Sequence, residues 1–221
     1  MKTAVIAGAS GMIGIELCRQ LALENSGFDR VVALTRRPLD FSFPKLEERQ
    51  AELGRLGALD LGGGMDVAFC SLGTTIKVAG SPEGFRLVDY DYVVAFARFA
   101  KAAGARVFVL LTSVDASANS GNFYLRVKGE AELAVEAVGF ESLYVFRPSF
   151  LMGARREVRV GERLGIVAAK ALSFALVGPL RKYRPMLSEV LAGGMRGAAL
   201  EARAGRHVCQ YDDIVKLSNC G

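Results

Sequence analysis

Along the first 150 residues, short continuous apolar runs alternate with longer segments in which apolar residues recur every three or four positions. The short runs have the length and composition of strands that are buried on both faces of a parallel sheet. We predict such strands at residues 3–7, 31–34, 66–70, 106–111 and 143–146.

The longer segments have the pattern of helices that lie against a sheet. In residues 12–24, Ile13, Leu17 and Leu21 share one helical face, and Asn25-Ser26-Gly27 supplies a stop signal. Two further helices are predicted over about residues 84–103 and 122–138. Strands that alternate with helices indicate an α/β fold, a doubly wound parallel sheet with helices on both faces.

Two parts of the chain fit this pattern less well. Leucines at 46, 53, 56 and 59 could form a helix, but the strand-helix-strand order asks for a strand around residues 48–51, and we prefer the strand. Beyond Phe150 the alternation is less regular and Pro179 and Pro185 occur, so residues 151–221 are expected to form a small helical cap over the carboxyl edge of the sheet.

Composition limits the class of protein. The chain has 221 residues, of which 51% are hydrophobic and 23% charged, which excludes a disordered, collagenous or disulfide-stapled protein. Its cysteines are scattered, so neither a disulfide framework nor a metal site is expected, and a reducing cytoplasmic location fits. The apolar runs at residues 1–8 and 164–180 are too short or too interrupted for a signal peptide or a membrane span.

The net charge of +5 is carried mainly by residues 151–221. A solvated basic surface and the attraction of an anionic substrate or partner are both compatible with this excess. Aromatic residues do not interleave with the basic ones, so nucleic-acid binding is not expected.

A glycine-rich segment joins the first predicted strand to the first predicted helix. Glycines there let the backbone turn tightly and approach a pyrophosphate, whose charge meets free N–H groups at the helix N-terminus. We therefore predict dinucleotide binding; a glycine turn that only packs the helix closely is the alternative. The segment reads Gly8-Ala9-Ser10-Gly11-Met12-Ile13-Gly14.

The second predicted strand is followed by two arginines, Arg36 and Arg37. A protein that prefers NAD places an acidic residue here for the ribose 2′-hydroxyl, whereas a guanidinium suits the 2′-phosphate of NADP. We predict NADP(H), with NAD less favoured; two solvated loop arginines are the alternative.

A possible proton-transfer group follows the strand at residues 106–111. Ser113 comes directly after that strand, and Tyr124 and Lys128 lie four residues apart on the next helix, so they share a face. An ammonium beside a phenol favours the phenolate, so Tyr124 could exchange a proton with a substrate oxygen while Ser113 holds that oxygen. In the alternative interpretation Tyr124 packs between helices and Lys128 is on the surface. Cys70 is expected in the core and His207 in a terminal strand.

With these motifs in place, the chain resembles the atypical short-chain dehydrogenase/reductase superfamily. Within it, the chain is similar to the Tat-interacting-protein-like oxidoreductases over nearly its whole length. The segments that carry the resemblance are Cys70-Ser71-Leu72-Gly73-Thr74-Thr75, Ala79-Gly80-Ser81-Pro82-Glu83-Gly84-Phe85, Val88-Asp89-Tyr90-Asp91-Tyr92, Leu110-Leu111-Thr112-Ser113, Asn122-Phe123-Tyr124-Leu125-Arg126-Val127-Lys128-Gly129-Glu130 and Val145-Phe146-Arg147-Pro148.

The resemblance implies an NAD(P)-binding Rossmann fold, with residues 1–221 as one domain to which 151–221 contribute a substrate-side cap. It implies that Leu72 and Gly73 line the cofactor, that Ser113, Tyr124 and Lys128 form the catalytic triad, and that Pro148 passes near the nicotinamide.

Two functions follow as hypotheses. The first is an NADPH-dependent oxidoreductase or epimerase/dehydratase-like enzyme that acts on a small carbonyl or hydroxyl compound. An anionic substrate group could then be bound by Arg147, Arg155, Arg156 or Arg184, although structural or solvated roles are the simpler explanation for most of them. The second is a non-enzymatic NADP(H)-binding redox sensor with a protein partner. A homodimer is the working expectation for the assembly.

Overall fold

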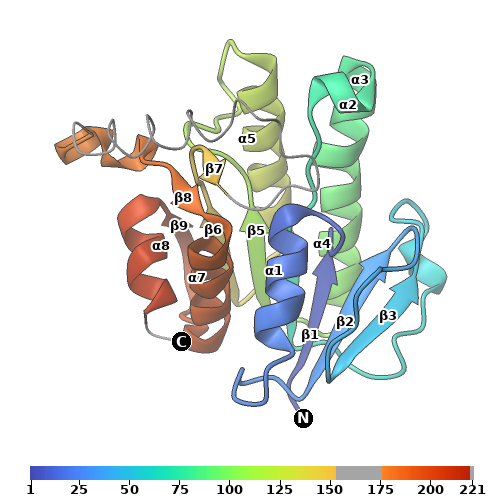
Figure 1. Ribbon diagram of the computed structural model, residues 1–221. Helices are drawn as coiled ribbons and strands as arrows, with labels where there is room; N and C mark the ends of the chain where they lie inside the picture. The colour runs from blue at the N-terminus through green and yellow to red at the C-terminus, as the bar shows by residue number, and fades with distance from the viewer. Residues whose placement is uncertain (153–175, 220–221) are drawn as a thin grey trace.

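The computed structural model describes residues 1–152 and 176–219 of the chain. Seven strands form one parallel sheet in the order β3-β2-β1-β4-β5-β6-β9 (Figure 1). This is the predicted doubly wound parallel sheet. The strands are β1 (Thr3–Ala7), β2 (Arg30–Thr35), β3 (Leu46–Gln50), β4 (Val67–Cys70), β5 (Val107–Leu111), β6 (Ser142–Phe146) and β9 (Gly205–Cys209).

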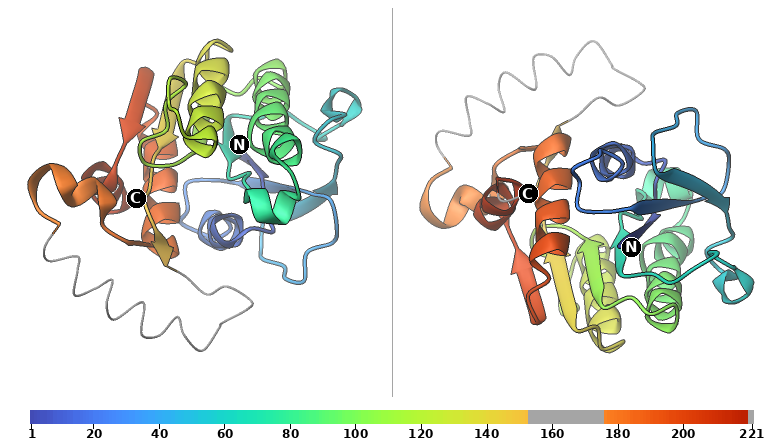
Figure 2. Two further views of the ribbon diagram at one scale, coloured as in Figure 1. Left: turned by 90° about the horizontal axis from the view of Figure 1, so that it is seen from above. Right: turned by 90° about the horizontal axis from the view of Figure 1, so that it is seen from below.

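Helices cover both faces of the sheet (Figure 2). The alternation of side chains along β1 shows how the two cores divide, because Ala4 and Ile6 join one apolar cluster and Val5 and Ala7 join the other. The first cluster includes side chains of α1 (Met12–Leu21), α7 (Ser188–Glu201) and α8 (Tyr211–Ser218). The second includes side chains of α4 (Tyr92–Ala102) and α5 (Phe123–Glu136).

The helix predicted over residues 84–103 is present but not regular. It consists of α3 (Pro82–Arg86), a π-helical turn (Leu87–Asp91) and α4. A short helix, α2 (Ile76–Ala79), precedes it, and a 3₁₀ turn (Leu56–Ala58) lies between β3 and β4. The strand preferred for residues 48–51 is confirmed as β3, which pairs with β2.

The C-terminal part of the chain requires a correction. Residues 188–209 do not form a cap: α7 packs on the α1 face of the sheet, and β9 extends the sheet beyond β6, which was expected to be the last core strand. The sequence pattern did not predict α7 because this helix is built largely from small residues, so that its core face lacks the leucine repeat of an ordinary amphipathic helix. A Cβ at Gly197 would lie 2.1 Å from the Leu217 carbonyl oxygen, so these small residues let α8 pack closely.

Three short elements lie at the carboxyl end of the sheet. They are β7 (Leu151–Met152), which pairs with β8 (Met186–Leu187), and the 3₁₀ helix η3 (Gly178–Tyr183). Arg155, Arg156 and most of the apolar stretch at 164–180 lie outside the described residues. In the described part of the chain, no helix has the length and apolar character needed to cross a bilayer.

The cysteines that the structure describes are core residues. Cys18, Cys70 and Cys209 are buried free thiols, and burial raises the pKa of each to about 12. Cys70 lies in the core, as predicted. Because the nucleophilic form of a thiol is the thiolate, its raised pKa also disfavours a role as a nucleophile. His207 lies in β9, the terminal strand expected for it.

Candidate functional site

The glycine segment forms a tight turn between β1 and α1. Gly8 has φ +89° and its carbonyl oxygen accepts a 3.0 Å hydrogen bond from the Gly11 N–H. A Cβ at Gly14 would lie 2.0 Å from the Gly8 oxygen, so only glycine allows α1 to begin this close to the turn. The N-cap residue Gly11 makes no side-chain capping bond, which leaves the first N–H groups of α1 available to an anion.

A cavity of about 170 Å³ opens beside this turn, at the point where the strand order reverses between β1 and β4. That position is where doubly wound folds bind dinucleotides. Its lining comes from the glycine turn, the end of β2 and the residue after it, the residues after β3 and β4, the π-helical turn and the first residue of α4. These residues are Gly8, Ser10, Gly11, Leu34, Thr35, Arg36, Ala51, Leu53, Ser71, Leu72, Gly73, Val88 and Tyr92.

The predicted cofactor residues differ in their position relative to this cavity. Six of them line the cavity: Gly8, Ser10, Gly11, Arg36, Leu72 and Gly73. Of the other residues in the glycine segment, Ile13 is buried in the α1 core, Met12 packs against that core, and Gly14 is buried behind the turn. These three residues therefore support the turn on its core side and do not line the cavity.

The loop after β2 presents the two predicted arginines. Arg36 and Arg37 are both exposed, and within the described residues neither guanidinium has an ion-pair partner. Glu48 of β3 holds the loop from both sides, since it accepts hydrogen bonds of 3.0 Å from the Thr35 hydroxyl and the Leu39 N–H. Arg36 lines the cavity, and Arg37, the next residue along the loop, does not.

The reactive residues lie on α5 and at the ends of two strands. Asn122 caps α5, and one turn of helix then separates Tyr124 from Lys128. Tyr124 is half-buried, with its ring centroid 5.3 Å from that of Phe85. Lys128 is buried, and its Nζ lies 3.5 Å from the position that a Cβ on Gly73 would take. The lysine of the Tyr/Lys pair thus contacts the wall of the glycine-loop cavity.

Ser113 and Pro148 are neighbours in the structure. Ser113 is half-buried just beyond β5, and the next residue, Val114, donates a 2.9 Å hydrogen bond to the Pro148 carbonyl oxygen. The loop then returns to the first turn of α5, where the Ser117 N–H donates to the Leu125 oxygen at 3.1 Å.

Asp89 is a site residue that the sequence analysis missed. It lies in the π-helical turn and is 1% exposed. Its Oδ2 accepts a 2.9 Å hydrogen bond from the Thr74 N–H. Its Oδ1 makes no well-aligned hydrogen bond but lies 2.8 Å from Lys128 Nζ, so the contact is an ion pair. Burial raises the pKa of Asp89, and the Lys128 ammonium opposes that rise.

Two arginines considered for substrate binding have structural partners instead. Arg147 is bound to the carboxylate of Glu132, and Arg184 Nε donates to the Leu176 carbonyl at 2.8 Å. The Glu132 carboxylate therefore neutralises Arg147, whereas the Leu176 carbonyl accepts only one of the Arg184 donors.

Comparison with known proteins places the chain in a family. Protein HTATIP2 of Rattus norvegicus is 37% identical over 226 residues, which cover 98% of this chain and 93% of that protein. The chain belongs to the HTATIP2 family. This confirms the resemblance to the atypical short-chain dehydrogenase/reductase proteins.

More distant relatives of this HTATIP2-family chain include yeast proteins. Protein FMP52, mitochondrial, of Eremothecium gossypii is 35% identical over 69% of the chain and 67% of its own length. No protein-family model matches the sequence.

Solved structures confirm the fold. MoeE5 in complex with UDP-glucose and NAD superposes with a TM-score of 0.69 and 17% identity, covering 99% of this chain and 81% of its own. Human epimerase family protein SDR39U1 with NADPH gives a TM-score of 0.64 and 18% identity, covering 95% and 74%. At these identities the likeness concerns the Rossmann architecture.

Proposed function

We propose that the protein is an NADP(H)-dependent oxidoreductase acting on a small carbonyl or hydroxyl compound. The observation that carries the proposal is the contact between Lys128 and the Gly73 wall of the glycine-loop cavity. It links the two motifs, because a dinucleotide that entered at Gly8–Gly14 would meet the helix that carries Tyr124.

The residues of the cavity suit NADP(H). The turn at Gly8 and the uncapped N–H groups of α1 would hold the pyrophosphate, with Arg36 and Arg37 at the 2′-phosphate and Lys128 at the nicotinamide ribose. Pro148, beside Ser113, would border the ring. When bound, the nicotinamide supplies or accepts the hydride.

Proton transfer to or from the substrate would be carried out by side chains of the protein. Tyr124 Oη would exchange a proton with the substrate oxygen, and the Ser113 hydroxyl would hold that oxygen by a hydrogen bond. The Lys128 ammonium, paired with Asp89, would supply a positive charge on the same helix face as Tyr124.

Cofactor preference is tested by calorimetric titration with NADPH and NADH. Arg36→Ala is expected to weaken NADPH binding by roughly tenfold, the value of one charge-assisted contact, and to leave NADH binding unchanged. Arg55→Ala, which removes an exposed arginine away from the cavity, is the control and should alter neither. Equal dissociation constants for both nucleotides that Arg36→Ala does not change would contradict the NADP preference.

Turnover is tested by NADPH oxidation against a panel of carbonyl compounds. Tyr124→Phe is expected to abolish turnover while cofactor binding persists. If the wild-type protein binds NADPH tightly but turns over no compound, the second hypothesis, a redox sensor that binds a protein partner, replaces the enzyme.

The compartment is part of the proposal. Three buried free thiols support a reducing environment, for which we propose the cytoplasm. The FMP52 relatives are named mitochondrial, so cell fractionation is the decisive measurement.

A further inference from the structure

A buried carboxylate lies on the same helix as the Tyr/Lys pair. Glu132 of α5 is four residues after Lys128 and eight after Tyr124, so the three side chains follow one helix face. Glu132 is 1% exposed, and a charge this deeply buried needs strong partners.

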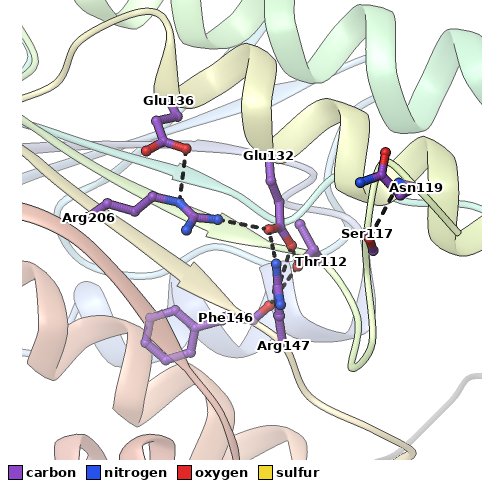
Figure 3. A network of polar contacts seen from close by, with 8 residues as sticks. All are labelled: Thr112, Ser117, Asn119, Glu132, Glu136, Phe146, Arg147 and Arg206. Atoms are coloured by element: carbon purple, nitrogen blue, oxygen red, sulfur yellow. Dashed lines mark hydrogen bonds and ion pairs between the residues drawn. The ribbon is translucent and has the colours of Figure 1, made fainter.

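Three elements supply those partners (Figure 3). The Thr112 hydroxyl at the end of β5 donates to Glu132 Oε1 at 2.8 Å. Arg147 at the end of β6 donates from Nε to the same oxygen at 2.9 Å and from Nη2 to Oε2. Arg206 of β9 reaches Oε2 at 3.2 Å and also pairs with Glu136, one turn further along α5.

The partners of Glu132 adjoin the predicted active-site residues. Thr112 directly precedes Ser113, and Arg147 directly precedes Pro148. One carboxylate therefore connects the helix of Tyr124 and Lys128 with the strand ends that carry the other two site residues.

We propose that Glu132 is a positioning residue that fixes the rotation and depth of α5 against the ends of β5 and β6. The inference rests on the proposed function, and it assigns Glu132 no contact with cofactor or substrate. It holds Tyr124 and Lys128 opposite Ser113 and Pro148, so it acts on the nicotinamide end of the site and not on the adenosine end. Buried ion clusters contribute little net stability compared with apolar packing, whereas their geometry is specific.

The test compares two ligands and two variants at a temperature where all proteins are folded. NADPH occupies both ends of the site, and adenosine 2′,5′-bisphosphate occupies only the adenosine end. Glu132→Gln is expected to weaken NADPH binding by roughly tenfold and to leave bisphosphate binding within about twofold. Glu136→Gln makes the same charge change on the same helix without touching Thr112 or Arg147, and should alter neither affinity.

A purely structural role predicts a different result. In that case Glu132→Gln lowers the unfolding temperature but leaves both affinities unchanged, or weakens both ligands equally, and either result overturns the inference. Should Glu132→Gln fail to fold, Thr112→Val, which removes one hydrogen bond to the carboxylate, carries the same comparison with a smaller expected loss for NADPH alone. If the wild-type protein binds neither ligand, the proposed function itself fails.

Discussion

At the scale of single residues, the site depends on the buried ion pair of Asp89 and Lys128. Both side chains are almost fully buried and belong to different helical segments, so each is the other's counter-charge. An ammonium buried without a carboxylate would lose its hydration and gain nothing in return. Asp89 is therefore the counter-charge of Lys128 beside the cavity.

This pair gives a stability prediction. Asp89→Asn should lower the free energy of unfolding by about 3 kcal/mol, because it leaves Lys128 unpaired in the interior. Asp91→Asn, an exposed carboxylate two residues away, is the control and should cost less than about 0.5 kcal/mol. Urea unfolding of both variants measures the difference, and equal losses would show that the buried pair has no special role.

Residue spacing explains which site residues could be found from the sequence. Tyr124 and Lys128 share one helix, so their i, i+4 spacing was visible, and the glycine turn was visible as a local motif. Asp89 and Glu132 function through partners from other elements, at separations that no local pattern encodes. The contacts of Arg147 were missed for the same reason.

At the scale of elements, α5 is held in place by a close backbone contact. A Cβ at Gly129 would lie 2.2 Å from the Ser117 carbonyl carbon, in the loop that follows Ser113. Glycine at this position lets the helix pack directly on that loop, near Tyr124 and Lys128.

Gly129→Ala should therefore cost about 1–3 kcal/mol through overpacking, a fall of several degrees in the melting temperature. Gly193→Ala in α7 is the matched control, because its nearest contact of 3.4 Å is ordinary and helical alanine is favourable. Calorimetry on both variants tests this, and a neutral Gly129→Ala would mean that α5 is free to shift.

The loop after Ser113 is also bound to η3 by polar contacts. Asp115 Oδ1 lies 2.6 Å from Lys182 Nζ, and its Oδ2 accepts a 2.7 Å hydrogen bond from the Tyr183 hydroxyl. Hydrogen bonds from Lys182 and Tyr183 lower the pKa of Asp115. A carboxyl with a lowered folded-state pKa stabilises the protein above its unfolded pKa, about 3.9, and this contribution is lost as pH falls through the folded-state pKa.

Asp115→Asn should consequently reduce stability at neutral pH, and the difference from wild type should shrink as pH falls below about 3.9. Asparagine tolerates the positive φ of 59° at this position as aspartate does, so the comparison isolates the charge. Urea midpoints across the pH range measure it. A difference that is constant with pH would show that the ion pair contributes nothing.

Element prediction succeeded where the order of strands and helices constrained it. Residues 46–50 have an ambiguous pattern, yet the alternation required a strand there, and β3 occupies the place. The π-helical turn that contains the buried Asp89 was not predicted, because the apolar spacing of the chain does not distinguish it from a regular helix.

At the scale of the whole molecule, one sheet topology brings both motifs to the same edge. The glycine turn follows β1, Ser113 follows β5 and Pro148 follows β6, all at the carboxyl ends of parallel strands. The first 150 residues revealed this arrangement through their alternating pattern. A terminal strand was expected at His207, but neither its pairing with β6 nor helix α7 was predicted, because a helix of small residues and a partly exposed edge strand lack strong apolar periodicity.

The central claim is that this edge brings a nicotinamide to Tyr124, and a crystal structure with bound NADP⁺ tests it most directly. The expected result has the pyrophosphate on the turn at Gly8, the 2′-phosphate at Arg36, and nicotinamide C4 on the side of Tyr124 with Lys128 at the ribose. A nucleotide bound elsewhere, or a nicotinamide ring directed away from the Tyr124 hydroxyl, would contradict the account.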